Sequence, residues 1–261
     1  MNISISVIIP CYNSSKTIRN CIKSIIEQSE PVDEIIIVDD GSTDQTLNII
    51  YDIMINFENQ VKFIIFEQNN SGPSIARNKG IQLSNCNYIA FLDSDDEWLI
   101  DHIKNIKKFL SKNIDYKIVA TKYLSAPFTY TGEILFDKLL YRNYFLTPCT
   151  VFSKNIFSTC HYHYFKEEMK YAEDYYLWLN IIHKNKGFVI DYIGAKNIIN
   201  KMPFGDKGLS KNLKAMHNGV LFCYEQLYEN KIINYKKFVF VKIFEKIKYL
   251  RRYILTLIKI S

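Results

Sequence analysis

The sequence predicts an α/β fold, in which a mostly parallel central sheet carries helices on both faces and a helical tail follows. Short apolar runs alternate with longer segments of helical spacing across the first 110 residues. Ser, Asp, Gly and Pro stand between these segments, where helix caps and turns are expected. This alternation is typical of parallel strands joined by helical crossovers, with ligands bound at the carboxyl ends of the strands.

Four strand–helix units account for residues 1–110. Strands are expected in the short apolar runs at residues 3–9, 34–38, 61–66 and 88–92. Helices are expected at residues 14–28, 42–54, 74–84 and 98–110. A serine stands at the start of each of the first three helices, where its hydroxyl can serve as a cap.

The spacing loosens after residue 117. Strands are expected at 118–124 and 147–153, and helices at 173–183, 211–229 and 235–258. Pro203, Gly205 and Gly208 indicate a mobile loop at residues 201–210. We therefore expect one domain at residues 1–210, with halves at 1–110 and 111–210, and a helical C-terminal extension at 211–261.

Composition limits the class of protein. The chain has 261 residues, of which 48% are hydrophobic and 23% charged, and this suits one globular domain with additions. Its six cysteines form no Cys-x-x-Cys pair, so free thiols in a reducing cytoplasm are expected. We expect no signal peptide before the first apolar run, and no stretch reaches the roughly 20 apolar residues that span a bilayer. The sequence thus predicts a cytoplasmic protein.

Basic charge is concentrated in the tail. The chain carries +6 overall, whereas residues 231–261 hold nine Lys or Arg and one acid, a net +8 that leaves −2 elsewhere. This excludes a uniformly basic nucleic-acid-binding surface, and no nucleic-acid partner is expected.

The tail is amphipathic if it is helical. Its apolar face then holds Phe240, Ile243, Phe244, Ile247, Leu250, Ile254 and Leu257, and its opposite face holds Lys248, Arg252 and Lys259. Such a helix can lie in an anionic membrane interface, or it can pack its apolar face on the domain. Both interpretations are open at this point.

Acidic residues follow two of the expected strands. Asp39 and Asp40 end the second strand, and Asp93, Asp95 and Asp96 end the fourth. Carboxylates repel bare phosphate, so a nucleotide can sit among these acids only if a divalent cation neutralises its diphosphate.

The glycine-rich sequences of other nucleotide-binding folds are missing. Pro-Cys-Tyr-Asn at residues 10–13 stands where Gly-x-Gly-x-x-Gly would be needed, and no Gly-x-x-x-x-Gly-Lys-Ser/Thr loop is present. Arg77 and Lys79, early in the third helix, can supply positive charge to a phosphate. These acids are therefore candidates for a metal-dependent nucleotide site. Acidic residues before a helix also serve as helix caps or stand in a solvated turn, and the residues alone leave both interpretations open.

Five short motifs follow one another along the chain. They are Ser-Val-Ile-Ile-Pro-Cys-Tyr-Asn at 6–13, Val-Asp-Asp-Gly-Ser-Thr-Asp at 38–44, Ala-Arg-Asn-Lys-Gly-Ile at 76–81, Leu-Asp-Ser-Asp-Asp at 92–96 and Glu-Asp-Tyr-Tyr-Leu-Trp at 173–178. This series resembles family 2 glycosyltransferases, inverting enzymes of the GT-A fold, over about residues 3–210. The resemblance implies a Rossmann-like GT-A domain that binds a nucleotide sugar with residues 1–110 and an acceptor with residues 111–210.

The resemblance also implies roles in binding the nucleotide. Pro10, Tyr12 and Asn13 would line a uridine pocket. Asp40 would accept a hydrogen bond from the base, with Asp39 beside it.

Further roles concern the metal and the reaction. By the same resemblance, Asp93 would contact the ribose or bridge to the metal, and Asp95 would ligate Mn²⁺ or Mg²⁺. Asp96 would lie close to the donor sugar. In the Glu173–Asp174 pair, Asp174 would be the general base that removes the acceptor proton.

The implied activity is transfer of a hexose, with glucose or galactose favoured, from a UDP-sugar to a lipid-diphosphate-linked sugar of the GlcNAc type. A single displacement would give a β-linkage in O-antigen or a related surface polysaccharide. A lipid-linked acceptor favours peripheral contact with the anionic cytoplasmic face of the inner membrane. Two alternatives remain: a nucleotidyltransferase of similar topology, and a catalytically silent nucleotide-sugar-binding or assembly subunit.

Other polar residues receive no role from the sequence. Cys160, His161 and His163 have no fourth ligand at suitable spacing and are expected at the surface. His217 stands where some relatives place a histidine near the metal. The two lysines of residues 201–210 stand where relatives often have Arg or His.

Overall fold

The computed structural model describes residues 3–126, 130–159, 164–198 and 211–260. Within them, one nine-stranded sheet has the order β3-β2-β1-β4-β8-β6-β9-β5, and β7 pairs with β9. The strands are β1 (Ile5–Cys11), β2 (Glu34–Asp39), β3 (Lys62–Glu67), β4 (Tyr88–Phe91), β5 (Asp96–Trp98), β6 (Tyr116–Tyr123), β7 (Gly132–Ile134), β8 (Thr150–Ser153) and β9 (Lys186–Asn197).

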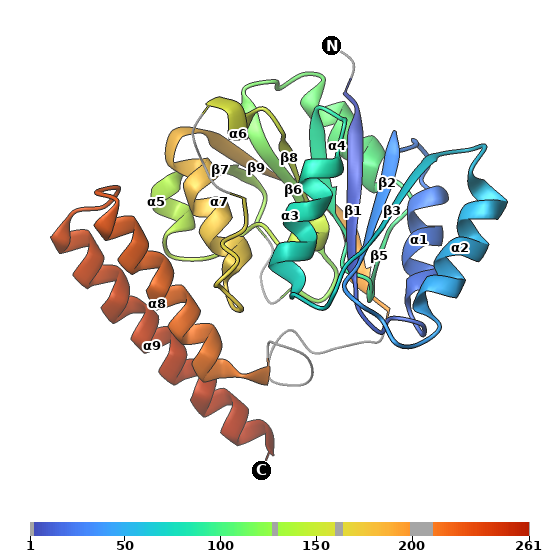
Figure 1. The fold of residues 1–261 in the computed structure, drawn as a ribbon. Helices are drawn as coiled ribbons and strands as arrows, with labels where there is room; N and C mark the ends of the chain where they lie inside the picture. The colour runs from blue at the N-terminus through green and yellow to red at the C-terminus, as the bar shows by residue number, and fades with distance from the viewer. Residues whose placement is uncertain (1–2, 127–129, 160–163, 199–210, 261) are drawn as a thin grey trace.

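Helices cover both faces of this sheet, as the sequence predicts (Figure 1). They are α1 (Ile18–Ile26), α2 (Thr46–Phe57), α3 (Pro73–Leu83), α4 (His102–Leu110), α5 (Phe136–Leu139), α6 (Ile156–Thr159), α7 (Glu173–Lys184), α8 (Leu213–Glu229) and α9 (Tyr235–Ile260), with a 3₁₀ turn, η1, at Thr147–Cys149. Strand order reverses after β3, so right-handed crossovers place α1 and α2 on one face and α3 on the other.

The first half of the sheet is parallel, which confirms the prediction for the first four strands. Strand β1 pairs in parallel with β2 and with β4, and β2 pairs in parallel with β3. Every residue of β1 and β2 is buried, because helices cover both faces there. The carboxyl ends of β1, β2 and β4 therefore meet at one edge of the sheet.

The second half of the sheet is mixed. Strand β8 is antiparallel to β4 and β6, and β9 is parallel to β6 but antiparallel to β5 and β7. Strands β5, β7 and β9 were not expected from the sequence. The first two have only three residues each, and Gly187 and Gly194 interrupt the apolar pattern of β9. The helix expected at 98–110 begins only at His102, because Trp98 is the last residue of β5.

Helix α3 packs closely on β1. A Cβ atom added to Gly80 would lie 2.3 Å from Cγ2 of Ile8, so any larger residue at this point of the helix would force the Ile8 side chain to shift. The rings of Phe152 and Phe165 contact Trp178 of α7, and both also contact Phe91 of β4. This aromatic cluster joins β4 and β8 to α7.

Helices α8 and α9 form an antiparallel hairpin that packs against α7 (Figure 1). The Tyr224 hydroxyl donates to the carbonyl of Leu140 (2.8 Å), and the Cys223 thiol donates to the carbonyl of Ala172 (3.6 Å). Ala172 directly precedes α7. The hairpin is therefore fixed to the segment that carries Glu173 and Asp174.

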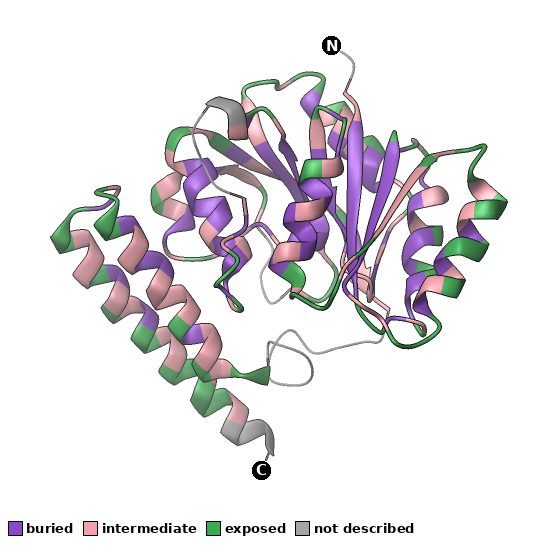
Figure 2. Ribbon diagram, in the orientation of Figure 1, coloured by how far each residue is buried: buried purple, intermediate pink, exposed green. Residues whose placement is uncertain are grey.

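Most of the apolar face of α9 points to solvent. Phe240, Ile243, Ile247, Leu250 and Ile254 are all exposed, whereas Val241 and Glu245 on the other side are fully buried (Figure 2). The interpretation in which this apolar face packs on the domain is wrong for Ile243, Ile247, Leu250 and Ile254. The Phe240 ring is exposed on one side only, because its other side meets Tyr141 edge to face at a centroid distance of 6.0 Å. The side chain of Leu257 lies outside the described residues.

Two expectations from composition can be compared with the described residues. None of the helices described there has the length and apolar character needed to cross a membrane. Five of the six cysteines, Cys11, Cys21, Cys86, Cys149 and Cys223, are free and buried, and Cys160 lies outside the described residues.

Candidate active site

The ends of β1 and β2 are tied together by short polar side chains. Asn13 adopts a left-handed backbone conformation with φ of 48°, and its Oδ1 accepts a hydrogen bond from the backbone N–H of Thr43 (2.8 Å). Asp39 accepts from the N–H and the hydroxyl of Ser42 (2.9 and 2.5 Å). These bonds leave the Tyr12 ring half exposed at the edge of the sheet.

Asp40 organises the segment between β3 and α3. Its Oδ1 accepts from Nε2 of Gln68 and from the N–H of Ser71, and its Oδ2 accepts from the N–H of Gly72, each at 2.8 Å. Gly72 has φ of +95°, which favours glycine. Both oxygens of Asp40 are thus engaged, at the edge of the sheet where the carboxyl ends of β1, β2 and β4 meet.

Arg77 joins the two halves of the site. Its NH2 group lies 2.8 Å from Oδ1 of Asp93, and its NH1 group lies 3.0 Å from Oε1 of Glu173. Burial disfavours the charged guanidinium, but the Asp93 and Glu173 carboxylates outweigh this and raise the pKa of Arg77. The pairing with Glu173 was not expected from the sequence.

The three acids after β4 differ in their exposure. Asp93 and Asp95 are partly exposed, whereas Asp96 is buried as the first residue of β5. Asp96 Oδ1 accepts from the Tyr123 hydroxyl (2.6 Å) and from Nδ2 of Asn197 (3.0 Å). Burial, reinforced by the Asp93 charge, raises the pKa of Asp96. Tyr123 and Asn197 come from β6 and β9, so no local motif indicates them.

Asp174 lies in the first turn of α7 and keeps a partly exposed side chain. Its carboxylate accepts from the Tyr175 N–H (2.6 Å), and from Nδ2 of Asn143 and the Thr147 hydroxyl (3.3 Å each). Burial, followed by the charge of Glu173, raises the pKa of Asp174 to about 7. A carboxylate with such a pKa accepts a proton near neutral pH.

The acids suit a metal that is shared with a substrate. Among the described residues, no group of three or more His, Cys, Asp and Glu side chains is placed to hold an ion. Mg²⁺ and similar cations are commonly held by one or two carboxylates together with substrate phosphates. Asp93 and Asp95 fit this kind of site, because both are partly exposed where the carboxyl end of β4 meets the edge of the sheet.

Other candidates lie elsewhere. The His217 ring stacks on Tyr249 of α9 with a centroid distance of 4.5 Å, and its Nδ1 lies 3.6 Å from Oε1 of Glu245. It belongs to the C-terminal hairpin. Cys160, His161 and His163, like the two lysines of the 201–210 loop, lie outside the described residues.

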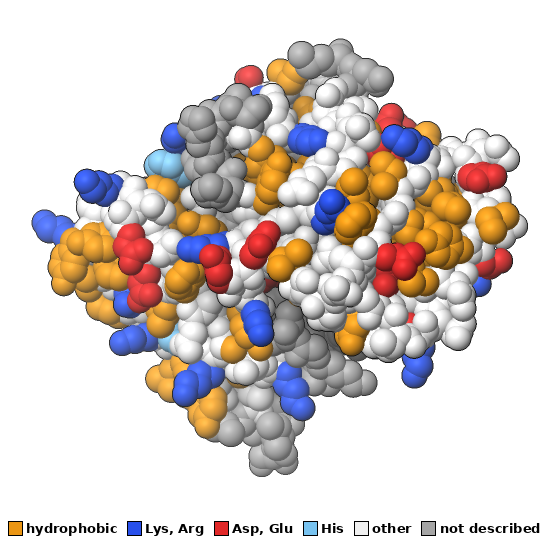
Figure 3. Space-filling view, viewed as in Figure 1, with side chains coloured by type: hydrophobic (Ala, Val, Ile, Leu, Met, Phe, Trp, Pro, Cys, Tyr) orange, Lys and Arg blue, Asp and Glu red, His pale blue; other side chains and the backbone are white. Residues whose placement is uncertain are grey.

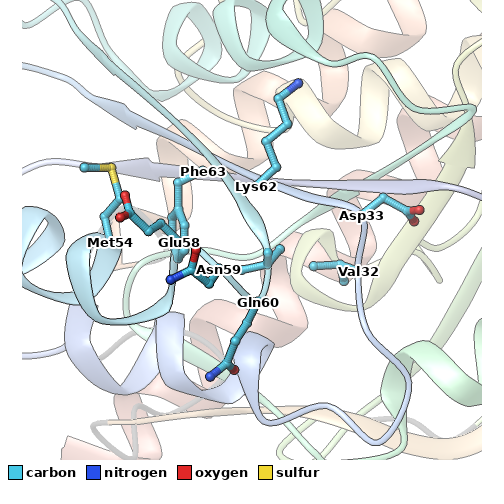
Figure 4. A pocket seen from close by; sticks show the side chains of 9 residues that line it. Val32, Asp33, Met54, Glu58, Asn59, Gln60, Lys62 and Phe63 are labelled. Atoms are coloured by element: carbon cyan, nitrogen blue, oxygen red, sulfur yellow. The ribbon is translucent and has the colours of Figure 1, made fainter.

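A pocket of about 480 Å³ lies at the opposite end of the sheet (Figure 4). It lies where β2 and β3 begin, whereas Asp40 and Asp93 follow the carboxyl ends of β2 and β4. The residues that line it are Val32, Asp33, Met54, Glu58, Asn59, Gln60, Val61, Lys62 and Phe63. This pocket therefore takes no part in the site described above.

Comparison with known proteins places these features in a family. The model of "Glycosyl transferase family 2" matches residues 6–171. WfgD of Escherichia coli, a UDP-Glc:alpha-D-GlcNAc-diphosphoundecaprenol beta-1,3-glucosyltransferase, is 28% identical over 214 residues, which are 80% of this chain and 80% of WfgD. WfaP of Escherichia coli, which bears the same enzyme name, is 32% identical over 190 residues, covering 69% of this chain and 70% of WfaP. Several other curated relatives are matched over only 26% to 47% of their own length.

A solved structure shares the fold. The crystal structure of S. aureus TarS 1-349 in complex with UDP-GlcNAc has a TM-score of 0.69 and 22% identity, over 86% of this chain and 66% of that one. This likeness confirms the GT-A architecture expected from the motifs.

Proposed function

The chain belongs to glycosyl transferase family 2, and we propose that it transfers a hexose from a UDP-sugar to a lipid-diphosphate-linked sugar with inversion. Glucose is the first donor sugar to test and galactose the second, because WfgD and WfaP are named for UDP-Glc. Their names also give the acceptor class, alpha-D-GlcNAc-diphosphoundecaprenol. The product would be a β-linked sugar of a surface polysaccharide.

One observation carries this proposal. Arg77 pairs with both Asp93, which follows β4, and Glu173, the neighbour of Asp174. A carboxylate suited to proton transfer is thereby held next to the acids that would bind a nucleotide sugar through its metal.

The reaction needs two charge changes that these residues can serve. The acceptor hydroxyl gives its proton to Asp174 as its oxygen forms a bond to the anomeric carbon, and the bond from that carbon to the diphosphate breaks to release UDP. A divalent ion held by Asp95 and Asp93 together with the diphosphate would stabilise the negative charge of the leaving group. A base on the face opposite the leaving group gives inversion, so an α-linked donor yields a β-linkage.

Two residues hold Asp174 for this role. Asn143 and Thr147 donate to the Asp174 carboxylate and restrict its rotamer. Tyr123 and Asn197 similarly fix Asp96, which we place beside the donor sugar. Pro10, Tyr12, Asn13, Asp39 and Asp40 would receive the uridine.

A donor screen tests the proposal. The full chain is incubated with UDP-glucose, UDP-galactose or UDP-GlcNAc, Mn²⁺ or Mg²⁺, and a synthetic GlcNAc-diphosphate-lipid, and the release of UDP is measured. NMR of the product gives the anomeric configuration. No UDP release with any donor would favour a catalytically silent nucleotide-sugar-binding subunit, and an α-linked product would contradict inversion. The nucleotidyltransferase alternative loses its support, because the chain belongs to family 2.

A further inference from the structure

The outer face of α9 is an apolar stripe. Ile247, Leu250 and Phe240 have exposed fractions of 62%, 58% and 55%. Ile243 and Ile254 are also exposed and complete the row at helical spacing. We call these five residues the α9 stripe. Apolar residues also expose themselves singly elsewhere, but a continuous row on one helix face indicates a surface that is covered in use.

Exposed cations border the α9 stripe. Lys246 and Arg251 lie on either side of it, and Lys236 lies near its start. None of these three forms an ion pair within the described part of the chain. Figure 3 shows apolar and basic side chains, with some acidic ones, at the left and lower left, where Figure 1 places the hairpin.

The one acid of the tail is kept away from this surface. Glu245 is fully buried on the inner side of α9, with Lys248 Nζ at 2.8 Å from its Oε2. Arg252 pairs with its other oxygen. The inner cations are thus neutralised, and the outer ones define a positive border around apolar side chains.

We infer that the α9 stripe docks on an anionic lipid surface. This inference rests on the proposed function, because a lipid-linked acceptor brings the enzyme to a bilayer. The apolar side chains would enter the boundary between headgroups and acyl chains, while Lys246 and Arg251 meet the lipid phosphates. A second copy of the chain fits less well, since it would bring the same cations together with no exposed acid of α9 to pair with them.

Docking through α9 would also orient the active site. Helix α8 connects the stripe to α7 through the contact of Cys223 with Ala172 and that of Tyr224 with Leu140. Asp174 lies two residues after Ala172. The base would therefore be held at a fixed height above the surface from which the acceptor's diphosphate emerges.

Co-sedimentation of the full chain with vesicles tests the inference. Anionic vesicles of phosphatidylcholine with about 30% phosphatidylglycerol are compared with vesicles of pure phosphatidylcholine, each at low and high salt. The stripe variant is Ile247→Ser with Leu250→Ser. The matched control is Ile55→Ser with Ile100→Ser, because Ile55 and Ile100 are exposed to 67% and 63% on other surfaces. The charge variant is Lys246→Gln with Arg251→Gln.

We expect the wild type and the control to bind the anionic vesicles at low salt and to be released at high salt. The stripe variant should lose at least about tenfold in partition coefficient. The charge variant should lose about fivefold for each cation removed, since each contributes about 1 kcal/mol near an anionic surface.

Two results would overturn the inference: a wild type that stays in the supernatant at low salt, or a stripe variant that sediments as the wild type does. If, in addition, the wild type is a dimer in analytical ultracentrifugation and the stripe variant a monomer, the stripe is an interface between copies. Transfer to a water-soluble short-chain acceptor is measured in parallel and should be equal for all variants. Binding without any transfer would contradict the proposed function and leave the docking inference supported.

Discussion

Arg77 and Glu173 lie 96 positions apart in the sequence and form a buried ion pair of 3.0 Å. The pair joins α3 to α7, the helix that carries Asp174. Because both side chains are buried, removing either partner leaves a charge without its counterion in a poorly solvated place.

Arg77→Gln should therefore destabilise the fold by about 3 kcal/mol or more, measured as a lower urea midpoint at unchanged slope. Arg77→Lys is the matched control for charge, and it should recover part of the loss because it cannot contact Asp93 and Glu173 at once. An Arg77→Gln protein as stable as the wild type would show that the pair contributes nothing to folding.

Asp174→Asn should lower kcat by a factor of about 10² or more, because the amide cannot take the acceptor proton. Binding of the UDP-sugar, followed by calorimetry, should be retained. Glu173→Gln should cost less kcat, since its predicted action on the reaction passes through Arg77 and Asp174. Near-normal kcat in Asp174→Asn would move the search for the base to Asp96.

Activity should vanish with EDTA and return with Mn²⁺ or Mg²⁺. Asp95→Ala should abolish turnover and leave the thermal unfolding midpoint close to that of the wild type, because Asp95 is partly exposed. Asp52→Ala is the matched control and should keep full activity. It removes an exposed acid of α2 that pairs with Arg19 of α1, away from the acids after β4. Full turnover in EDTA would contradict a metal-dependent mechanism.

The pH dependence of kcat should show an acid limb near pH 7. Asp174 must be ionised to act as a base, and its pKa is raised to about 7 by burial and by Glu173. Thr147→Val removes a hydrogen bond to the ionised form, so the limb should move to higher pH. Thr150→Val is the control, because the Thr150 hydroxyl bonds to the carbonyl of Leu146 instead.

The same shift has a consequence for stability. The folded state keeps Asp174 protonated up to a higher pH than the unfolded chain does, because the ordinary pKa of an aspartate is 3.8. This group's contribution to stability is therefore present below about pH 4 and is lost as the pH rises through 7. Asp174→Asn should flatten that part of the stability profile, and an unchanged profile would count against the raised pKa.

Gly80→Ala should destabilise the protein by about 1–3 kcal/mol, because the new methyl group would meet the Ile8 side chain at 2.3 Å. Combining it with Ile8→Ala should cost less than the sum of the two single changes, as a double-mutant cycle in urea would show. Additive costs would mean that the two residues do not share this contact.

The parallel half of the fold follows from local sequence. The β1 and β2 strands are mostly apolar, with Ser6, Glu34 and Asp39 as their polar residues, and such a run is the signal expected of a strand buried on both faces. The short strands β5 and β7 give no such signal, and they exist because β9 offers them an edge. Their pairing is a property of the assembled sheet.

The candidate site divides in the same way. Asp93, Asp95 and Asp174 stand in motifs, so their neighbours in the chain indicate them. Tyr123 and Asn197 reach Asp96 from distant strands, and only the folded sheet brings them to it. Asn143 and Thr147 are found by their hydrogen bonds to Asp174 and by nothing in their own sequence context.

If Asp40 binds the base as we propose, the three donors around its carboxylate make that contact an exchange of hydrogen bonds. A uracil N–H that bonds to Asp40 must displace Gln68, Ser71 or Gly72, or share an oxygen with one of them. The net free energy of that contact is then a small difference between two hydrogen bonds of similar strength. A base that displaces one of these donors would remove one of the bonds that hold residues 68–72. This segment leads directly into α3, which starts at Pro73 and carries Arg77, so occupancy of the base site would be coupled to the start of that helix.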